Sequence, residues 1–237
     1  EIIVRFGDRR QGSPGIRLQT FCEETFEFRV LVDAFATYNY VELPEQPTIA
    51  IIPGPPTLFK AILPTERSLG TAFALCMKGE DHWGNPSDLC DQTFKVVANM
   101  TVAGLPDAIT FAKGAFAAIA DDLRMQTTGD LIIELVDGEG GTVARSNPCR
   151  FSENAALLPY WGDLHGQSEE TIGTNSAREF YEFARDKAFL DICVHQGNDF
   201  QISNEFWQHL NELSAEFTVD DSFIVFPGWE WSGNTGL

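Results

Sequence analysis

Three short segments in the last third of the chain contain side chains that can bind a metal ion or transfer a proton. They are segment 163–168 (DLHGQS), segment 195–199 (HQGND) and segment 228–234 (GWEWSGN). Each follows an apolar stretch with strand character, and imidazole combined with carboxylate suits Zn²⁺, Mn²⁺ or Fe²⁺. A single histidine near a strand end is more often a hydrogen-bonded structural residue than a ligand. Three successive strand ends with such residues favour a functional site.

The elements that must position these segments alternate between strand and helix. Ser176 and Glu179 have the spacing of a capping box, which predicts the start of a helix at that point. A second helix is predicted further on, because apolar residues recur there at helical spacing. The helical positions are Phe180, Phe183, Ala184 and Ala188 in the first helix, and Phe206, Trp207, Leu210 and Leu213 in the second. Strands are expected near 158–161, at 190–194 and at 222–226.

Strand and helix alternation predicts parallel strands joined by right-handed crossovers. In such architectures the reactive groups lie at the carboxyl ends of the strands, where the three polar segments are expected. An open sheet of three parallel strands would leave an unpaired edge. Residues 155–237 are therefore predicted to be the first three units of an α/β barrel, and the sequence to be a fragment of a longer one.

The region 1–154 has a different pattern, with short apolar runs separated by proline and glycine. We expect a β-sandwich of immunoglobulin type, either one domain or two modules in tandem. Segment 106–120 is rich in alanine and fits a helix or a strand equally well. Segment 79–87 (GEDHWGNPS) resembles a turn of bacterial immunoglobulin-like modules, so Asp81 and His82 are expected to serve the turn rather than a metal.

Two of the polar segments resemble motifs of the PHP (polymerase and histidinol phosphatase) superfamily. Segment 160–168 (YWGDLHGQS) is similar to its first motif, D-L-H-x-H-[ST], and segment 226–232 (FPGWEWS) to its P-G-x-E segment. Segment 184–199 occupies the place of the second motif. With its β-rich beginning, the chain is similar to a bacterial family of unknown function allied to PHP proteins.

The resemblance implies a metal site of one or two divalent ions, Mn, Zn or Fe. His165 and Glu230 match metal ligands, and Asp163 matches a residue that would orient the imidazole. Gln167 stands where the family has a second histidine. In the second motif either His195 or Asn198 takes the ligand role. The candidate catalytic residues are Asp163 and Gln167, the candidate ligands are His165, Glu230 and His195, with Asn198 and Asp199 as alternatives, and Trp229 and Trp231 are expected to line a substrate pocket.

The function that the resemblance implies is metal-dependent hydrolysis of a small molecule, such as a phosphate ester, by a metal-activated water. Hydrolysis of an amide or another ester is the alternative enzyme reading. A ligand-binding protein with a degenerate metal site is the alternative outside enzymes. Ser168 lacks the GxSxG context of a serine nucleophile. Arg178 and Arg185 lie in the predicted helix and form no phosphate-binding cluster.

The amino-acid composition limits the classes of partner that the protein is expected to bind. The formal net charge of −19 argues against binding to nucleic acid or to an anionic membrane, and no apolar run reaches the roughly 18 residues needed to span a bilayer. The 5 cysteines are widely spaced, which favours reduced thiols and a cytoplasmic setting, with a Cys76–Cys90 pair as the alternative. The chain opens without Met, which is compatible with a removed leader. Nothing in the sequence indicates an oligomeric state.

Overall fold

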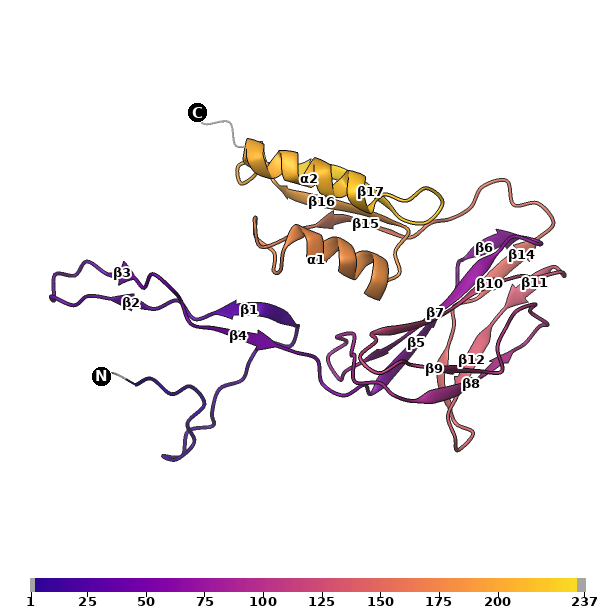
Figure 1. Ribbon diagram of the computed structural model, residues 1–237, viewed down its shortest axis with the longest axis horizontal. Coiled ribbons are helices and arrows are strands. Elements are labelled where there is room, and N and C mark those ends of the chain that lie inside the picture. Colours follow the sequence, from indigo (N-terminus) through magenta and orange to yellow (C-terminus); the bar gives the residue numbers. More distant parts are fainter. Residues whose placement is uncertain (1–2, 234–237) are drawn as a thin grey trace. The chain divides into compact units, whose positions relative to one another are not determined.

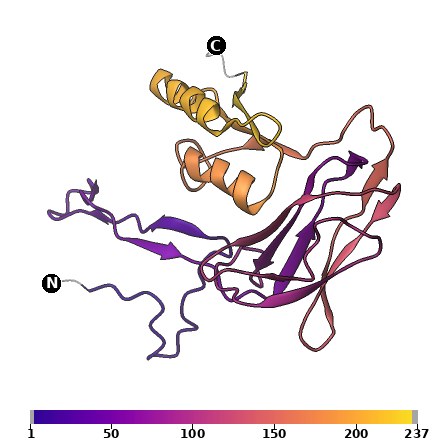
Figure 2. The same ribbon diagram turned by 45° about the vertical axis from the view of Figure 1, so that its right-hand side comes forward.

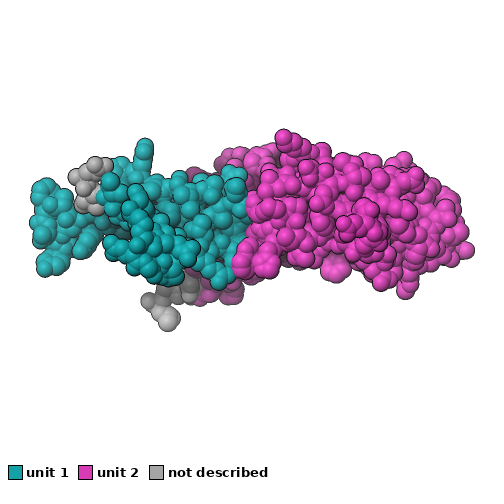
Figure 3. Space-filling model, turned by 90° about the horizontal axis from the view of Figure 1, so that it is seen from below, with its two compact units in different colours: residues 1–52 teal, residues 53–237 magenta. Residues whose placement is uncertain are grey.

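The structure is a computed structural model that describes residues 3–233, so Asn234 of the third polar segment lies outside the described residues. The chain divides into two compact units, residues 1–52 and residues 53–237 (Figure 3). The predicted boundary between 1–154 and 155–237 falls inside the second unit and stays a prediction.

The first unit consists of two antiparallel ribbons. Strand β1 (Glu23–Glu27) pairs with β4 (Thr48–Ile51), and β2 (Leu31–Val32) pairs with β3 (Val41–Glu42). Between β2 and β3 the Asp33 carboxylate accepts the backbone N–H groups of Phe35, Thr37 and Tyr38 at 2.7–3.2 Å. The loop is thereby fixed with Phe35 and Tyr38 87% and 91% exposed. From residue 3 to residue 52 no side chain is buried, so the ribbons form no core of their own.

The β-rich part of the second unit places its strands around one hydrophobic core (Figure 1). The strands are β5 (Leu58–Ile62), β6 (Glu66–Ser68), β7 (Phe73–Glu80), β8 (Thr93–Ala98), β9 (Ala108–Thr110), β10 (Ala117–Leu123), β11 (Gly129–Leu131), β12 (Ile133–Val136), β13 (Thr142–Arg145) and β14 (Cys149–Ser152). They form three sheets in the orders β10-β7-β5, β11-β14-β6 and β13-β12-β8-β9. Alternate residues of β7 and β12 point inward, and full burial of such an apolar side chain stabilises the fold by about 1.5–3 kcal/mol.

Several expectations for this region can be compared directly with the structure. The β-rich character of the region is confirmed. Segment 106–120 contains the strand β9 and the start of β10, with Ile109 and Phe111 buried in the core. The Asp81 carboxylate accepts the backbone N–H groups of Trp83 and Asn85 at 2.8 and 3.0 Å, which confirms its role in a turn. Cys76 and Cys90 do not form a disulfide with each other.

The remaining part of the second unit is a parallel sheet in the order β15-β16-β17 (Figures 1 and 2). Its elements are β15 (Gly162–Gly166), α1 (Ala177–Glu182), the π-helical turn η1 (Phe183–Lys187), β16 (Ile192–Asn198), α2 (Asn204–Phe217) and β17 (Ile224–Glu230). The predicted capping box is present, because the Ser176 side chain accepts the Glu179 N–H and the Glu179 carboxylate accepts the Ser176 N–H.

Both helices cover the same face of this sheet. Tyr181 from α1, Leu213 and Phe217 from α2, and Cys193 and Val225 from the strands belong to one buried cluster. Consecutive strands joined by right-handed crossovers require this one-sided arrangement. Phe226 follows Val225 in β17, points to the opposite face and is 53% exposed.

The prediction of an α/β barrel was wrong. The structure is mostly β, with 36% strand and 11% helix, and no barrel is closed. A barrel of this type needs eight tilted parallel strands, whereas the described residues supply one sheet of three. The alternation of strand and helix identified the local unit correctly, but it carried no information on closure.

Candidate metal centre

Each of the three polar segments begins within a strand and continues past its end, rather than lying wholly in the loop that follows. Asp163 and His165 belong to β15, His195 to β16, and Glu230 is the last residue of β17. The register pairs Gly166 with His195, and Asn198 with Glu230. Because the strands are parallel, their carboxyl ends meet at one edge of the sheet, as expected.

His165 and Glu230 come together at this edge. The Nε2 atom of His165 lies 3.5 Å from the Oε2 atom of Glu230, although the two residues are on the outer strands of the sheet. Their side chains are 68% and 39% exposed, so both can be reached by solvent. Two ligand atoms that each bind the same Zn²⁺ ion at about 2.0–2.2 Å are separated by a similar distance, so the spacing of Nε2 and Oε2 fits a shared ion. We call His165 and Glu230 the strand-end pair.

His195 is buried and points toward the helices instead. Its ring lies between Phe180 and Phe206, with centroids 6.2 and 5.5 Å away. The Gly197 N–H donates to Nδ1 at 3.3 Å, and Nε2 lies 2.7 Å from Ser168 Oγ. Since Nδ1 accepts, Nε2 carries the proton and donates to the serine. Both ring nitrogens are therefore engaged, and the structure does not bring His195 to the strand-end pair.

The same geometry gives Ser168 a structural role. Ser168 is buried and accepts the proton of His195 Nε2, so the histidine does not act on it as a base. Burial holds the pKa of His195 below its ordinary value, and the carboxylate of Glu170 opposes this shift. The pair was not predicted from the sequence. Its signal would have been that His195 stands two residues after Cys193, on the same face of a strand.

Of the two candidate catalytic residues, Asp163 binds a backbone N–H group and Gln167 is half-buried. Asp163 Oδ1 accepts the backbone N–H of His165 at 3.0 Å, so it fixes the main chain of His165 rather than its imidazole ring. Gln167 is half-buried, and its Oε1 atom has no hydrogen-bond partner among the described residues. The structure does not place Gln167 with the strand-end pair.

The remaining candidates surround Glu230. Asn198 is its register partner, and the Asn198 Nδ2 group donates to Gln201 Oε1 at 2.9 Å. The Asp199 N–H donates to the backbone oxygen of Glu230 at 2.9 Å, and its Oδ2 accepts the Ser232 N–H at 3.3 Å. Asp199 thus connects the end of β16 to the end of β17. Trp229 and Trp231 flank Glu230 and are both exposed.

The donor set at this edge is small. Among residues 3–233 no three His, Cys, Asp or Glu side chains lie close enough together to hold a metal ion. The strand-end pair supplies two donors, and a catalytic zinc site ordinarily has three protein ligands. Asn198, which pairs with Glu230 in the register, carries an amide oxygen of the kind that can act as a metal ligand.

Comparison with known proteins adds one distant relative. An uncharacterized protein of Chlamydia pneumoniae is 21% identical over 224 residues, which cover 92% of this chain and 36% of that protein. The chain therefore spans little more than a third of the relative's length. No model of a known protein family matches the chain. No helix among the described residues combines the length and the apolar character needed to cross a bilayer.

Proposed function

We propose that the strand-end pair binds a divalent metal ion and that the protein is a metal-dependent hydrolase. The observation that carries the proposal is the 3.5 Å approach of His165 Nε2 to Glu230 Oε2 at the carboxyl edge of a parallel sheet. The resemblance of segments 160–168 and 226–232 to PHP motifs supports the same two residues as ligands.

The neighbouring residues fit a supporting role. Asp163 fixes the backbone of His165, and Asp199 fixes the backbone of Glu230. Both donors are thereby held from the main chain, which limits the entropy that is lost when an ion binds. Imidazole and carboxylate suit Zn²⁺, Mn²⁺ or Fe²⁺ better than Mg²⁺ or Ca²⁺, which prefer oxygen ligands alone.

The chemistry proposed for this edge is hydrolysis. A bound divalent ion polarises the substrate and lowers the pKa of its water toward about 7. Trp231, which follows the end of β17, has an exposed ring that would contact the apolar part of a small substrate beside Glu230, whereas Trp229 alternates with Glu230 along the strand and points to the opposite face. A phosphate ester is the substrate class that the resemblance suggests.

Metal titration of three variants tests the site. We expect the protein to bind Mn²⁺ or Zn²⁺ with one ion per chain in calorimetry. His165→Ala and Glu230→Gln should each weaken binding by more than about 100-fold, because loss of a direct ligand exceeds the 10–100-fold effect of an outer contact. His82→Ala is the matched control, since His82 is an exposed histidine on a turn of the β-rich part. Equal binding by all three variants, or no binding by the unaltered protein, would contradict the metal site.

The activity is tested separately. The protein with added Mn²⁺ is assayed against p-nitrophenyl phosphate, bis-p-nitrophenyl phosphate and p-nitrophenyl acetate. Turnover of a phosphate ester that disappears in Glu230→Gln supports the proposed phosphoesterase. Turnover of the acetate alone would favour the other hydrolase class. Metal binding without turnover of any of the three substrates would refute phosphoesterase activity and leave only the metal site.

A further inference from the structure

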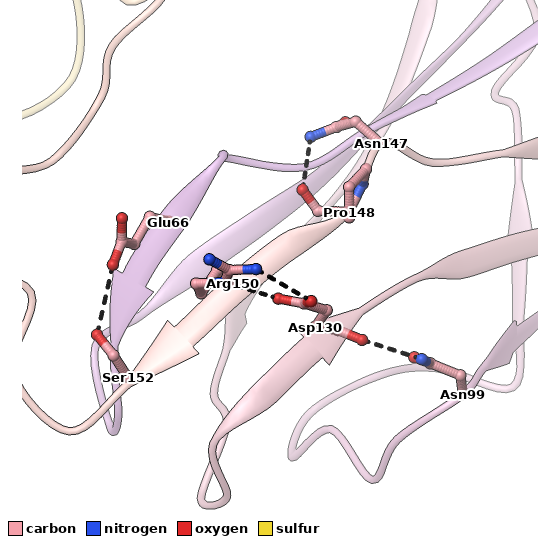
Figure 4. A network of polar contacts seen from close by, with 7 residues as sticks. All are labelled: Glu66, Asn99, Asp130, Asn147, Pro148, Arg150 and Ser152. Atoms are coloured by element: carbon pink, nitrogen blue, oxygen red, sulfur yellow. Dashed lines mark hydrogen bonds and ion pairs between the residues drawn. The ribbon is translucent and has the colours of Figure 1, made fainter.

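A second place that can bind a ligand lies in the β-rich part of the second unit, on the sheet β11-β14-β6. A hollow of about 200 Å³ is lined by Thr65, Glu66, Asp130, Pro148 and Arg150. Figure 4 shows these side chains except that of Thr65. These residues come from three separate stretches of the sequence. The hollow shares no residue with the strand-end pair.

Three of the lining residues form a row of charged side chains across the sheet, which we call the polar row. The register pairs Asp130 with Arg150 and Arg150 with Glu66, so the three residues stand side by side on one face. The Nε and Nη2 atoms of Arg150 donate hydrogen bonds to the two carboxylate oxygens of Asp130 at 3.0 and 3.3 Å. The order across the strands is therefore acceptor, donor, acceptor.

This row keeps hydrogen-bonding capacity for a ligand. A guanidinium group has five N–H donors, and the bidentate contact with Asp130 uses two of them. On the other side of Arg150, Ser152 Oγ lies 3.5 Å from Glu66 Oε1, at the long limit of a hydrogen bond. Glu66 can accept further bonds, and Arg150 can donate further bonds, toward the hollow.

Two asparagine side chains bond to the backbone of the lining residues Asp130 and Pro148 (Figure 4). Asn147 accepts the Leu63 N–H at 2.9 Å and donates to the Leu63 oxygen at 2.8 Å. Asn99 fixes the link between β11 and β12 in a similar way, because its side chain accepts the Ile132 N–H and donates to the backbone oxygen of Asp130. A ligand would therefore meet a preformed surface, which reduces the ordering cost of binding.

An exposed aromatic ring, that of Trp161, contacts a residue that lines the hollow. The Trp161 indole N–H donates to Thr65 Oγ1 at 2.8 Å, which ties the ring to a residue of the lining while it stays 63% exposed. The faces of such rings carry negative potential and attract the weakly positive C–H bonds of a sugar ring.

We propose that this hollow binds a neutral saccharide. Neighbouring hydroxyl groups of a sugar each donate and accept a hydrogen bond, which matches the alternation of Glu66, Arg150 and Asp130. The two carboxylates outnumber the one guanidinium, so the row disfavours phosphate and other anions. The exposed Trp161 ring supplies the apolar contact that a sugar needs and a small inorganic cation does not.

The test is a titration with neutral trisaccharides, using maltotriose, cellotriose and chitotriose as the probes. Backbone amide NMR of the intact protein follows binding up to about 20 mM, above the roughly millimolar dissociation constants expected of a few hydrogen bonds. We expect shifts confined to β6, β11 and β14. Glu66→Gln and Trp161→Ala should each weaken binding by at least about tenfold, as expected for the loss of one charged hydrogen bond or one ring contact.

Matched controls come from the same β-rich part of the second unit. Arg145 and Glu134 form another cross-strand pair, with Nε and Oε1 3.8 Å apart, and Trp83 is another exposed tryptophan. Arg145→Ala and Trp83→Ala should leave binding unchanged. Absence of saccharide-induced shifts, or equal losses in control and test variants, would overturn the proposal. So would binding of a lysine-rich peptide or MgCl₂ at this row without any saccharide binding.

Discussion

The two histidines of the parallel sheet, His165 and His195, show how little the residue type alone decides. Both follow apolar strand residues, and both lie near the carboxyl edge of the sheet. His195 points to the face that the helices cover, where it is buried and fully hydrogen-bonded. His165 is exposed and approaches Glu230. The face of the strand, rather than the position along it, separates a structural histidine from a candidate ligand.

The largest expected effect on the free energy of unfolding concerns the helix-covered face of the parallel sheet. We expect this face to stabilise the sheet more than the opposite face does. Phe223→Ala removes a fully buried ring from the cluster beneath the helices and should lower the free energy of unfolding by about 3–5 kcal/mol. Phe226→Ala, on the opposite face, is the matched control and should cost less than about 1 kcal/mol. Urea denaturation followed by tryptophan fluorescence measures both. Trp207, which is partly buried and packs against the same cluster, reports on this transition. Equal losses would contradict the one-sided packing.

A smaller effect is expected from the buried polar pair. Ser168→Ala removes the acceptor of the His195 Nε2 proton and leaves a buried donor without a partner, which should cost about 1–3 kcal/mol. The same denaturation experiment measures the change. His195→Phe together with Ser168→Ala should recover part of the loss, because the unpaired Nε2 donor is then removed as well. A double variant that is no more stable than Ser168→Ala would show that the hydrogen bond is not the cause.

The covered histidine should also make stability depend on pH. Burial lowers the pKa of His195 in the folded protein, so the unfolded chain binds the proton more readily. The stabilisation is therefore complete above the unfolded pKa of about 6.5 and is lost as the pH falls toward the folded value. Urea denaturation from pH 8 to pH 5 should show this decline, and His195→Gln should flatten it. An unchanged slope in His195→Gln would assign the pH dependence to other groups.

The sequence predicted the elements of the helix-covered face of the parallel sheet better than it predicted the carboxyl edge of that sheet. The capping box at Ser176 and the apolar spacing of α2 are local signals, and both elements formed where expected. The ends of the strands were misplaced, because Gln196, Gly197 and Asn198 are poor strand formers. Their pairing with residues 228–230 of β17 holds them extended nevertheless. His195 therefore lies inside a strand, and its direction follows from alternation with Cys193.

Contacts between distant segments were beyond prediction. Asp130, Arg150 and Glu66 form a row only because β14 pairs with β11 on one side and with β6 on the other. No local pattern around any of these residues indicates the pairing. The approach of His165 to Glu230 is also non-local, but the two motifs that carry them predicted the pair by resemblance.

The smallest expected effect on stability concerns the strand-end pair itself. His165 and Glu230 are exposed, and ion pairs of this kind contribute about 0–1 kcal/mol. His165→Ala and Glu230→Gln should therefore leave the urea transition nearly unchanged when no metal is added. In the presence of saturating Mn²⁺ or Zn²⁺, the unaltered protein should gain stability by mass action, and the two variants should not. A large loss of stability without metal would give His165 the same structural role as His195. The contrast between the two faces would then fail.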